Sequence, residues 1–181
     1  MKVVAPCELP PSALLQRVRL AGAFADCYTT EVTGPVTVAD LIEAFYTTRI
    51  FKLERLLIRL LASQNSTDLQ ARELAAGHRE DFAVWTVEQR LHDQVLLADR
   101  SGRTKSWFMV SPPAANPSQP TRLYFGSAVL PRIDQKTGEK GFGTVFRLLL
   151  GFHAAYSRAL LRAAALELQR RTVHRESPGR D

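Results

Sequence analysis

The sequence predicts an α+β fold in which a curved antiparallel sheet of about five or more strands wraps on one long C-terminal α-helix. The run from Phe142 to about Arg170 has apolar residues at spacings of three and four, which is typical of a helix laid along a core. After Gly77 the apolar pattern alternates instead, as it does in strands. The alternating runs are joined by short turns, which indicates an antiparallel meander.

The N-terminal third predicts one strand followed by two or three short helices. Phe24–Val32 is dense in aromatic and β-branched residues and is followed by a Gly-Pro pair, which favours a strand and its end. Thr37–Asp40 and Thr67–Gln70 each have the pattern of a capping box, in which the first and fourth residues bond each other's backbone amides at a helix start. Between them, Leu53–Leu61 has leucines on one face and basic residues on the other.

The second half predicts four strands and the closing helix. The strand runs are Phe82–Leu91, Gln94–Asp99, Thr104–Val110 and Thr121–Leu130, and Pro131–Gly141 connects them to the helix. At 1.5 Å per residue the helix spans about 40 Å, so it is the element long enough to cover the apolar face of the sheet. Its apolar stripe consists of Phe142, Val145, Leu149, Phe152, Tyr156, Leu160 and Ala163.

Length and composition predict a single domain. The chain has 181 residues, of which 45% are hydrophobic, enough for a sizeable core. We expect this domain to span residues 1–170 and residues 171–181 to form a charged, disordered tail. The net charge of +6 comes largely from arginines at that end, so we expect no nucleic-acid partner.

The sequence also predicts a cytoplasmic location. The opening residues are too short for the apolar core of a signal peptide, and no run of apolar residues is long enough to cross a membrane, so we expect no integral membrane segment. Cys7 and Cys27 are too sparse for a disulfide framework.

The order of elements resembles the helix-grip arrangement of the START and Bet v 1-like (SRPBCC, polyketide cyclase-like) superfamily, whose members usually enclose a pocket. A closer resemblance is to an uncharacterised bacterial domain family placed with that superfamily. Three stretches carry it: Ala25–Tyr28 followed by Val38–Leu61, then Gln94–Asp99, and finally Gly151–His153 followed by Arg158–Ala163. The resemblance implies a fold and a pocket but no particular activity.

Aromatic residues on three of the predicted strands point to a ligand pocket. Trp85 and Val87 lie on one side of their strand, as do Trp107 and Met109, and these side chains on one concave face would suit an apolar or ring-shaped ligand. The alternative is that they only fill the core. The predicted pocket residues are Phe45, Trp85, Val87, Trp107, Met109, Phe125, Phe152, His153 and Tyr156. We therefore expect a hydrophobic small molecule between the sheet and the C-terminal helix.

The pattern of titratable residues in the sequence does not identify a catalytic group. None of the four histidines has a partner at metal-ligand spacing, and no dinucleotide or phosphate-binding motif is present, so we expect no metal and no cofactor. His153 either bonds a neighbouring group at the core edge or faces the pocket as a polar group. Glu31, Glu88 and Asp99 either face water or face inward as candidate acids or bases.

Two other functions remain open. A cyclase- or isomerase-like enzyme would use the same pocket, with His153 or an inward carboxylate as the acid or base. An interaction or dimerisation module would instead use the apolar face of Ile50–Leu61, or the arginine-bearing face of the last helix, to bind a partner, a second copy or an anionic membrane surface.

Overall fold

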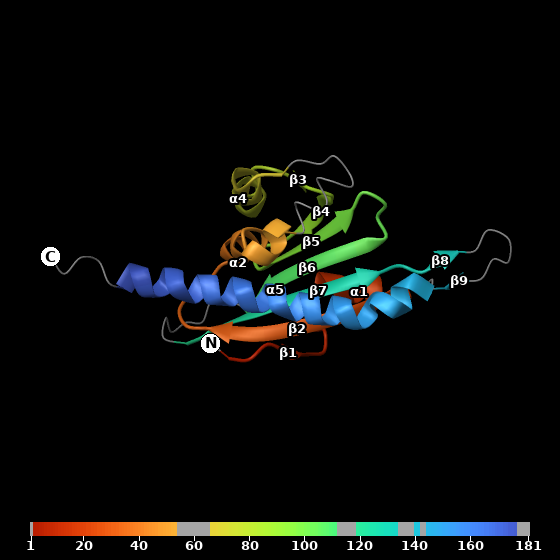
Figure 1. The fold of residues 1–181 in the computed structure, drawn as a ribbon, viewed down its shortest axis with the longest axis horizontal. Helices are drawn as coiled ribbons and strands as arrows, with labels where there is room; N and C mark the ends of the chain where they lie inside the picture. Colours follow the sequence, from red (N-terminus) through yellow and green to blue (C-terminus); the bar gives the residue numbers. More distant parts are fainter. Residues whose placement is uncertain (1, 54–65, 112–118, 134–139, 142–143, 177–181) are drawn as a thin grey trace.

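The computed structural model describes residues 2–53, 66–111, 119–133, 140–141 and 144–176. It confirms the α+β class: a seven-stranded, open antiparallel sheet has the strand order β1-β2-β7-β6-β5-β4-β3, and a long C-terminal helix, α5 (Thr144–Glu176), packs on it (Figure 1). The strands are β1 (Ala5–Pro6), β2 (Phe24–Val32), β3 (Asp81–Phe82), β4 (Trp85–Arg90), β5 (Gln94–Asp99), β6 (Thr104–Val110) and β7 (Thr121–Val129). A separate pair is formed by β8 (Arg132–Ile133) and β9 (Lys140–Gly141).

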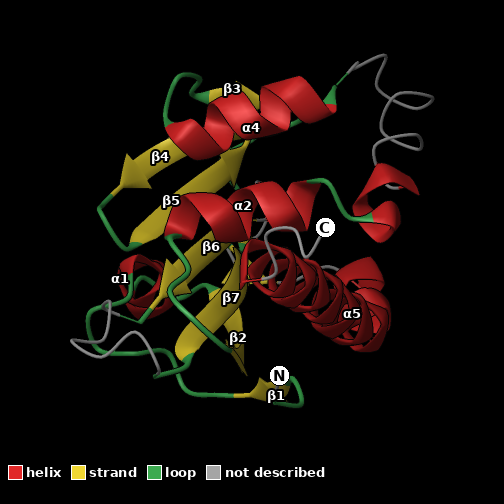
Figure 2. Cartoon of the chain, turned by 90° about the vertical axis from the view of Figure 1, so that its left-hand side faces the viewer, coloured by secondary structure: helices red, strands yellow, loops and turns green. Residues whose placement is uncertain are grey.

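Helices cover both faces of the sheet. The short helix α1 (Leu14–Leu20) lies on one face, which we call the α1 face. The other face, which we call the α5 face, is covered by α2 (Val38–Tyr46), α4 (Asp68–Ala76) and α5. Figure 2 shows α1 and α5 on opposite sides of the strands. The sheet is therefore the middle layer of three, and each of its faces has its own core.

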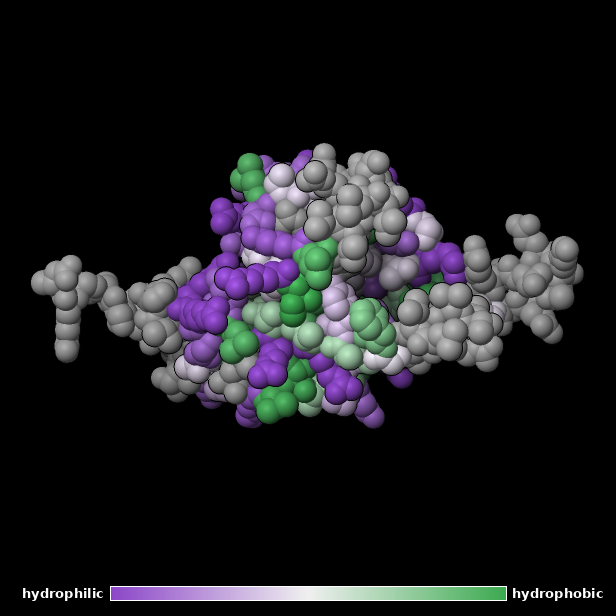
Figure 3. Space-filling view, viewed as in Figure 1, coloured by the Kyte–Doolittle hydropathy of each residue, from purple (hydrophilic) through white to green (hydrophobic). Residues whose placement is uncertain are grey.

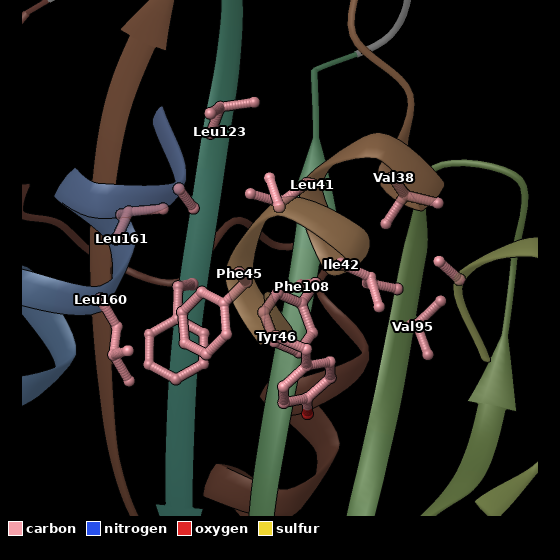
Figure 4. Close-up of a cluster of buried hydrophobic side chains, with 14 of the residues drawn as sticks. Val38, Leu41, Ile42, Phe45, Tyr46, Val95, Phe108, Leu123, Leu160 and Leu161 are labelled. Atoms are coloured by element: carbon pink, nitrogen blue, oxygen red, sulfur yellow. The ribbon is translucent and has the colours of Figure 1, made fainter. Parts of the chain in front are cut away.

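The larger core lies between the sheet and α2. Both predicted capping boxes are confirmed, and the one at Thr37 starts α2, where the Thr37 hydroxyl accepts a hydrogen bond from the Asp40 amide at 3.1 Å. This start directs one apolar face of α2 at the strands (Figure 4). The Phe45 ring lies 4.9 Å from that of Phe108 and 4.6 Å from that of Phe125, centroid to centroid. The rings fill the centre of the α5 face.

The helix α5 buries a different stripe from the predicted one. Leu160 is buried as expected, but Tyr156 and Ala163 are half-buried and Phe152 is 69% exposed. The helix instead buries three leucines and three small residues against the sheet, and small side chains let the helix axis approach the strands closely. The buried residues are Ser157, Leu160, Leu161, Ala164, Ala165 and Leu168. The side chains of Phe142, Val145 and Leu149 lie outside the described part of the helix.

The predicted leucine-rich helix and the predicted C-terminal tail lie at the limits of the described residues. The leucine-rich helix predicted over Leu53–Leu61 falls almost entirely on residues 54–65, outside the described residues. The helix α5 continues to Glu176, so residues 171–176 of the predicted tail are helical, and Arg171 bonds Glu167 and Glu43, each at 3.1 Å. Among the described helices, none is long and apolar enough to cross a membrane.

Gln94 holds α1 against the sheet. Its side-chain oxygen accepts hydrogen bonds from the backbone amide of Leu14 at 2.8 Å and from the indole N–H of Trp107 at 3.0 Å. Its side-chain nitrogen donates to the Ser12 carbonyl at 3.1 Å. Gln94 is buried, so this one amide satisfies two buried donors and one carbonyl group at the joint between β5, β6 and α1.

We expect Gln94→Leu to lower the free energy of unfolding by about 2–4 kcal/mol, because it leaves two buried donors, on Leu14 and Trp107, without an acceptor. Urea unfolding followed by circular dichroism measures this loss. In Trp107→Phe protein, where one of those donors is already absent, the same Gln94 substitution is expected to cost less. An equal loss in both backgrounds would contradict the hydrogen-bonded role of Gln94.

Candidate functional site

The register of the sheet places a polar row beside the aromatic core. Asp26 on β2 pairs with Ser127 on β7, Ser127 pairs with Ser106 on β6, and Ser106 pairs with Leu97 on β5. Directly paired residues point to the same face of a sheet, and Leu97 belongs to the core beneath α2. The polar row therefore lies on the α5 face, next to the row that contains Phe108 and Phe125.

A histidine from α5 completes a cluster with two residues of this row. Ser127, which is 3% exposed, donates from its backbone amide (3.0 Å) to Asp26 Oδ1, and its hydroxyl lies 2.7 Å from the same oxygen. His153 Nε2 lies 2.7 Å from the Ser127 hydroxyl and 3.7 Å from Asp26 Oδ2. We call these three residues the Asp26–Ser127–His153 cluster. It joins β2 and β7 to the helix that crosses them.

The cluster constrains where its protons lie. The Ser127 hydroxyl has one hydrogen, and the Asp26 carboxylate can only accept. When Ser127 donates to Asp26, His153 Nε2 must carry a hydrogen and donate to the Ser127 oxygen. This arrangement orients the imidazole ring and leaves its other nitrogen as the atom that can exchange a proton.

The cluster differs from the serine–histidine–aspartate triad of hydrolases. In the triad the imidazole lies between the hydroxyl and the carboxylate, so that it can take the hydroxyl proton. Here the hydroxyl of Ser127 lies between the imidazole of His153 and the carboxylate of Asp26, and it is buried. The geometry suits orienting a polar group or moving a proton, rather than attack by the serine oxygen.

Tyr28 and Arg158 extend the cluster along the boundary between β2 and α5. The Tyr28 hydroxyl donates to Asp26 Oδ2 at 3.4 Å, and the Arg158 guanidinium lies 5.8 Å from the centre of the tyrosine ring. Burial, and next the negative charge of Asp26, raise the pKa of Tyr28 above its ordinary value. Tyr28 therefore remains a neutral hydrogen-bond donor at neutral pH, so Asp26 has donors at both oxygens.

A buried indole nitrogen lies at the far edge of the same face. Trp85 on β4 pairs with Asp99, and Val87 pairs with Leu97, so both β4 side chains point to the α5 face. The Trp85 indole N–H is buried and contacts no hydrogen-bond acceptor among the described residues. A buried donor without an acceptor costs free energy, which a bound ligand or water would recover.

The structure places the predicted pocket residues on both faces of the sheet rather than on one. Phe45, Trp85, Val87, Phe125, His153 and Tyr156 contribute to the α5 face. Trp107 and Met109 pair with residues of the α1 face and lie in the core beneath α1, so the expectation of two indoles and a thioether on one concave face was wrong. Sequence shows which residues of one strand share a side, whereas the pairing register decides how neighbouring strands combine.

Phe152 also departs from its predicted place. It is 69% exposed and stacks on Tyr156, with ring centres 6.0 Å apart and an interplanar angle of 7°. On the face of the molecule that presents α5, hydrophobic residues are scattered among hydrophilic ones (Figure 3). Phe152 therefore does not line the space between helix and sheet.

The three strand carboxylates proposed as candidate acids or bases have other partners. Glu88 pairs with Lys105, and Asp99 accepts from the Thr104 amide at 3.0 Å in the turn before β6. Lys2 and Arg122 bond Glu31 and lower its pKa. Asp99 pairs with Trp85 and so points to the α5 face, at its far edge. The carboxylate that meets Ser127 and His153 is Asp26, and its position inside the strand-like run Phe24–Val32 was the sequence signal that could have identified it.

Surface grooves formed by described residues lie away from the predicted pocket. One of about 440 Å³ lies between Val4 and Arg158, one of about 480 Å³ lies between Thr48 and Glu167, and one of about 620 Å³ is lined by Cys7 and Cys27. None of these three includes a predicted pocket residue. Among the residues that the structure describes, no group of three or more metal-ligating side chains is placed to hold a metal ion.

The fold and the site define the class of protein. The chain is an α+β protein with a buried carboxylate, hydroxyl and imidazole cluster between an antiparallel sheet and its C-terminal helix. Compared with models of known protein families and with curated proteins, the chain shows no match.

Proposed function

We propose that the protein binds a hydrophobic small molecule between the sheet and α5, in a helix-grip arrangement like that of START and Bet v 1-like proteins. The Asp26–Ser127–His153 cluster carries this proposal, because it places polar groups at one point of an otherwise apolar seam between helix and sheet. Ligand pockets are mostly apolar, with a few convergent polar groups that orient the ligand. The ligand would be an apolar molecule with one polar substituent directed at His153.

The position of His153 supports this proposal. Its side chain is 36% exposed, while one ring nitrogen is held by Ser127. The ring therefore has a fixed orientation and keeps part of its surface free for a ligand. Trp85, at the far edge of the same face, would add a polar contact through its indole N–H to a ligand that extends from α5 to β4.

The proposal predicts that His153→Gln weakens binding of an apolar probe by about 10-fold, the effect of losing one hydrogen bond to a ligand. Nile red, a neutral fluorescent dye, is the probe, and its dissociation constant is measured by titration. His92→Gln is the matched control, since the His92 side chain is 81% exposed and lies on a turn away from the cluster. Equal dissociation constants for both variants would contradict a role for His153 in binding.

The two tryptophans test the position of the ligand. Trp85 lies on the α5 face and Trp107 on the α1 face. Trp85 is on β4, three strands from β7, whereas α5 contacts β2 and β7. Nile red that fills the space from α5 to β4 is expected to quench the remaining tryptophan emission in Trp107→Phe protein. Unchanged Trp85 emission would show that the probe does not reach β4 and would overturn a contact with the Trp85 indole. Native mass spectrometry of protein purified from its own host would identify a retained natural ligand.

An acid–base enzyme of the cyclase or isomerase type is the second candidate, and the proton arrangement of the cluster favours it. With Nε2 of His153 held by Ser127, the other ring nitrogen would act as the acid or base toward a bound carbonyl compound. Such an activity would show a pH dependence that is lost in His153→Gln protein while probe binding is retained. A simple binding protein would show no turnover.

A further inference from the structure

The two cysteines, which are 20 positions apart in sequence, meet at the edge of the sheet. Cys7 directly follows β1, and its amide donates to the Cys27 carbonyl on β2 at 2.9 Å. Their sulfur atoms are 2.8 Å apart, and both are free thiols. Cys27 is 5% exposed in the core beneath α1, whereas Cys7 is half-buried. The pair is therefore a dithiol with one accessible member and one buried member.

The environment makes the two thiols chemically unequal. The hydrogen bond from Cys27, with a smaller effect of Arg122, lowers the pKa of Cys7. The same hydrogen bond and burial raise the pKa of Cys27. Cys7 is also the more exposed of the two, so its sulfur is the better nucleophile at neutral pH.

A groove of about 620 Å³ is lined by both cysteines. Besides the cysteines, its lining includes Glu8, Gln16 and Arg19, which supply charged and hydrogen-bonding groups. Its volume is in the range of small-molecule sites and suits a polar compound the size of a short peptide. A small oxidant such as hydrogen peroxide would need no such space.

We propose that Cys7 and Cys27 form a reversible redox site that reacts with a low-molecular-weight disulfide bound in this groove. The Cys7 thiolate attacks one sulfur of the bound disulfide, whose S–S bond breaks, and the leaving thiolate takes up a proton. Cys27 then loses its proton and attacks Cys7 Sγ, which expels the second small thiol. The protein loses two protons and two electrons, and the small disulfide takes them up to become two thiols. The groove is also lined by Asp26 and Tyr28, but the reaction uses only the two sulfur atoms.

A disulfide between the two cysteines would have a structural effect. It would tie β1, a two-residue edge strand, to β2 and enclose α1 in a covalent loop. Local opening of this edge would become rarer.

Incubation with glutathione disulfide, followed by alkylation of free thiols and mass spectrometry, tests the site. Wild-type protein is expected to lose both free thiols together as a monomer, with no retained glutathione. Cys27→Ser protein is expected to retain one glutathione on Cys7, because the resolving thiol is absent. Cys7→Ser protein is expected to keep Cys27 unmodified, because that thiol is buried and protonated. Cys27→Ala serves if the serine variant unfolds.

Three results would overturn the proposal: wild-type thiols that both stay free, glutathione found on Cys27 in Cys7→Ser protein, or covalent dimers in place of the internal disulfide. Hydrogen exchange provides a second readout on the wild type. Oxidation is expected to slow exchange of the amides near β1 by about 10-fold or more, because the closed loop restricts opening. Unchanged exchange at these amides in the oxidised protein would contradict the structural effect.

Discussion

Phe45→Ala is expected to lower the free energy of unfolding by about 3–5 kcal/mol, the range for truncating a large buried aromatic side chain. Phe45 is 2% exposed and connects α2 to the sheet. Its ring contacts that of Phe108 on β6 (Figure 4) and that of Phe125 on the neighbouring strand β7. These partners belong to separate elements, so the cavity left by the substitution cannot close without moving α2. Urea or thermal unfolding measures the loss.

Phe152→Ala is the matched control, because it makes the same chemical change on the exposed side of α5. Its ring contact is with Tyr156 one turn along the same helix, so we expect a change within about 0.5 kcal/mol. Similar losses for the two variants would contradict the assignment of Phe45 to the core and of Phe152 to the surface. If Phe45→Ala protein stays stable and binds Nile red more tightly, Phe45 instead borders the ligand site.

Gly126→Ala is expected to lower the free energy of unfolding by about 2–3 kcal/mol, a typical cost of overpacking a core. A Cβ atom at Gly126 would lie 2.8 Å from the Asp26 carbonyl oxygen, 2.9 Å from Leu15 Cδ2 and 3.1 Å from Trp107 Cε3. The leucine can shift, but the carbonyl belongs to the backbone of β2. The added methyl group therefore forces β2 and β7 apart at the point where they also hold Ser127.

Gly151→Ala provides a control of opposite sign. Gly151 is an exposed residue of α5, and a Cβ atom there would meet nothing within 4 Å. Alanine favours the helix over glycine by about 1 kcal/mol, so this variant is expected to be more stable than the wild type. A stabilised Gly126→Ala protein, or equal effects at both glycines, would show that the close contacts at Gly126 do not restrict the sheet.

The local elements could be predicted because their signals lie within a few residues of each other. Both capping boxes, at Thr37 and at Thr67, start helices because a side chain and a backbone amide three residues apart bond directly. Alternation and β-favouring composition likewise identified the longer strands β2, β4, β5, β6 and β7, because the side-chain period of a strand is a local property. The two-residue strands β1, β3, β8 and β9 were not predicted, and the strand expected over Phe82–Leu91 is divided into β3 and β4. These signals, with the long final helix, were enough to determine the α+β class and the antiparallel sheet.

The candidate sites could not be predicted, because they depend on contacts between distant parts of the chain. Asp26 and Ser127 are 101 positions apart, and Cys7 and Cys27 meet only through the pairing of an edge strand. A shift of one residue in register would reverse the face of every side chain in a strand, and no local pattern specifies which strands are neighbours. The sequence by itself therefore determined the elements and their class. The tertiary structure decided that Trp85 and Trp107 lie on opposite faces of the sheet. It also decided which stripe of α5 is buried and which polar groups meet. These outcomes follow from packing and strand pairing across the whole sheet.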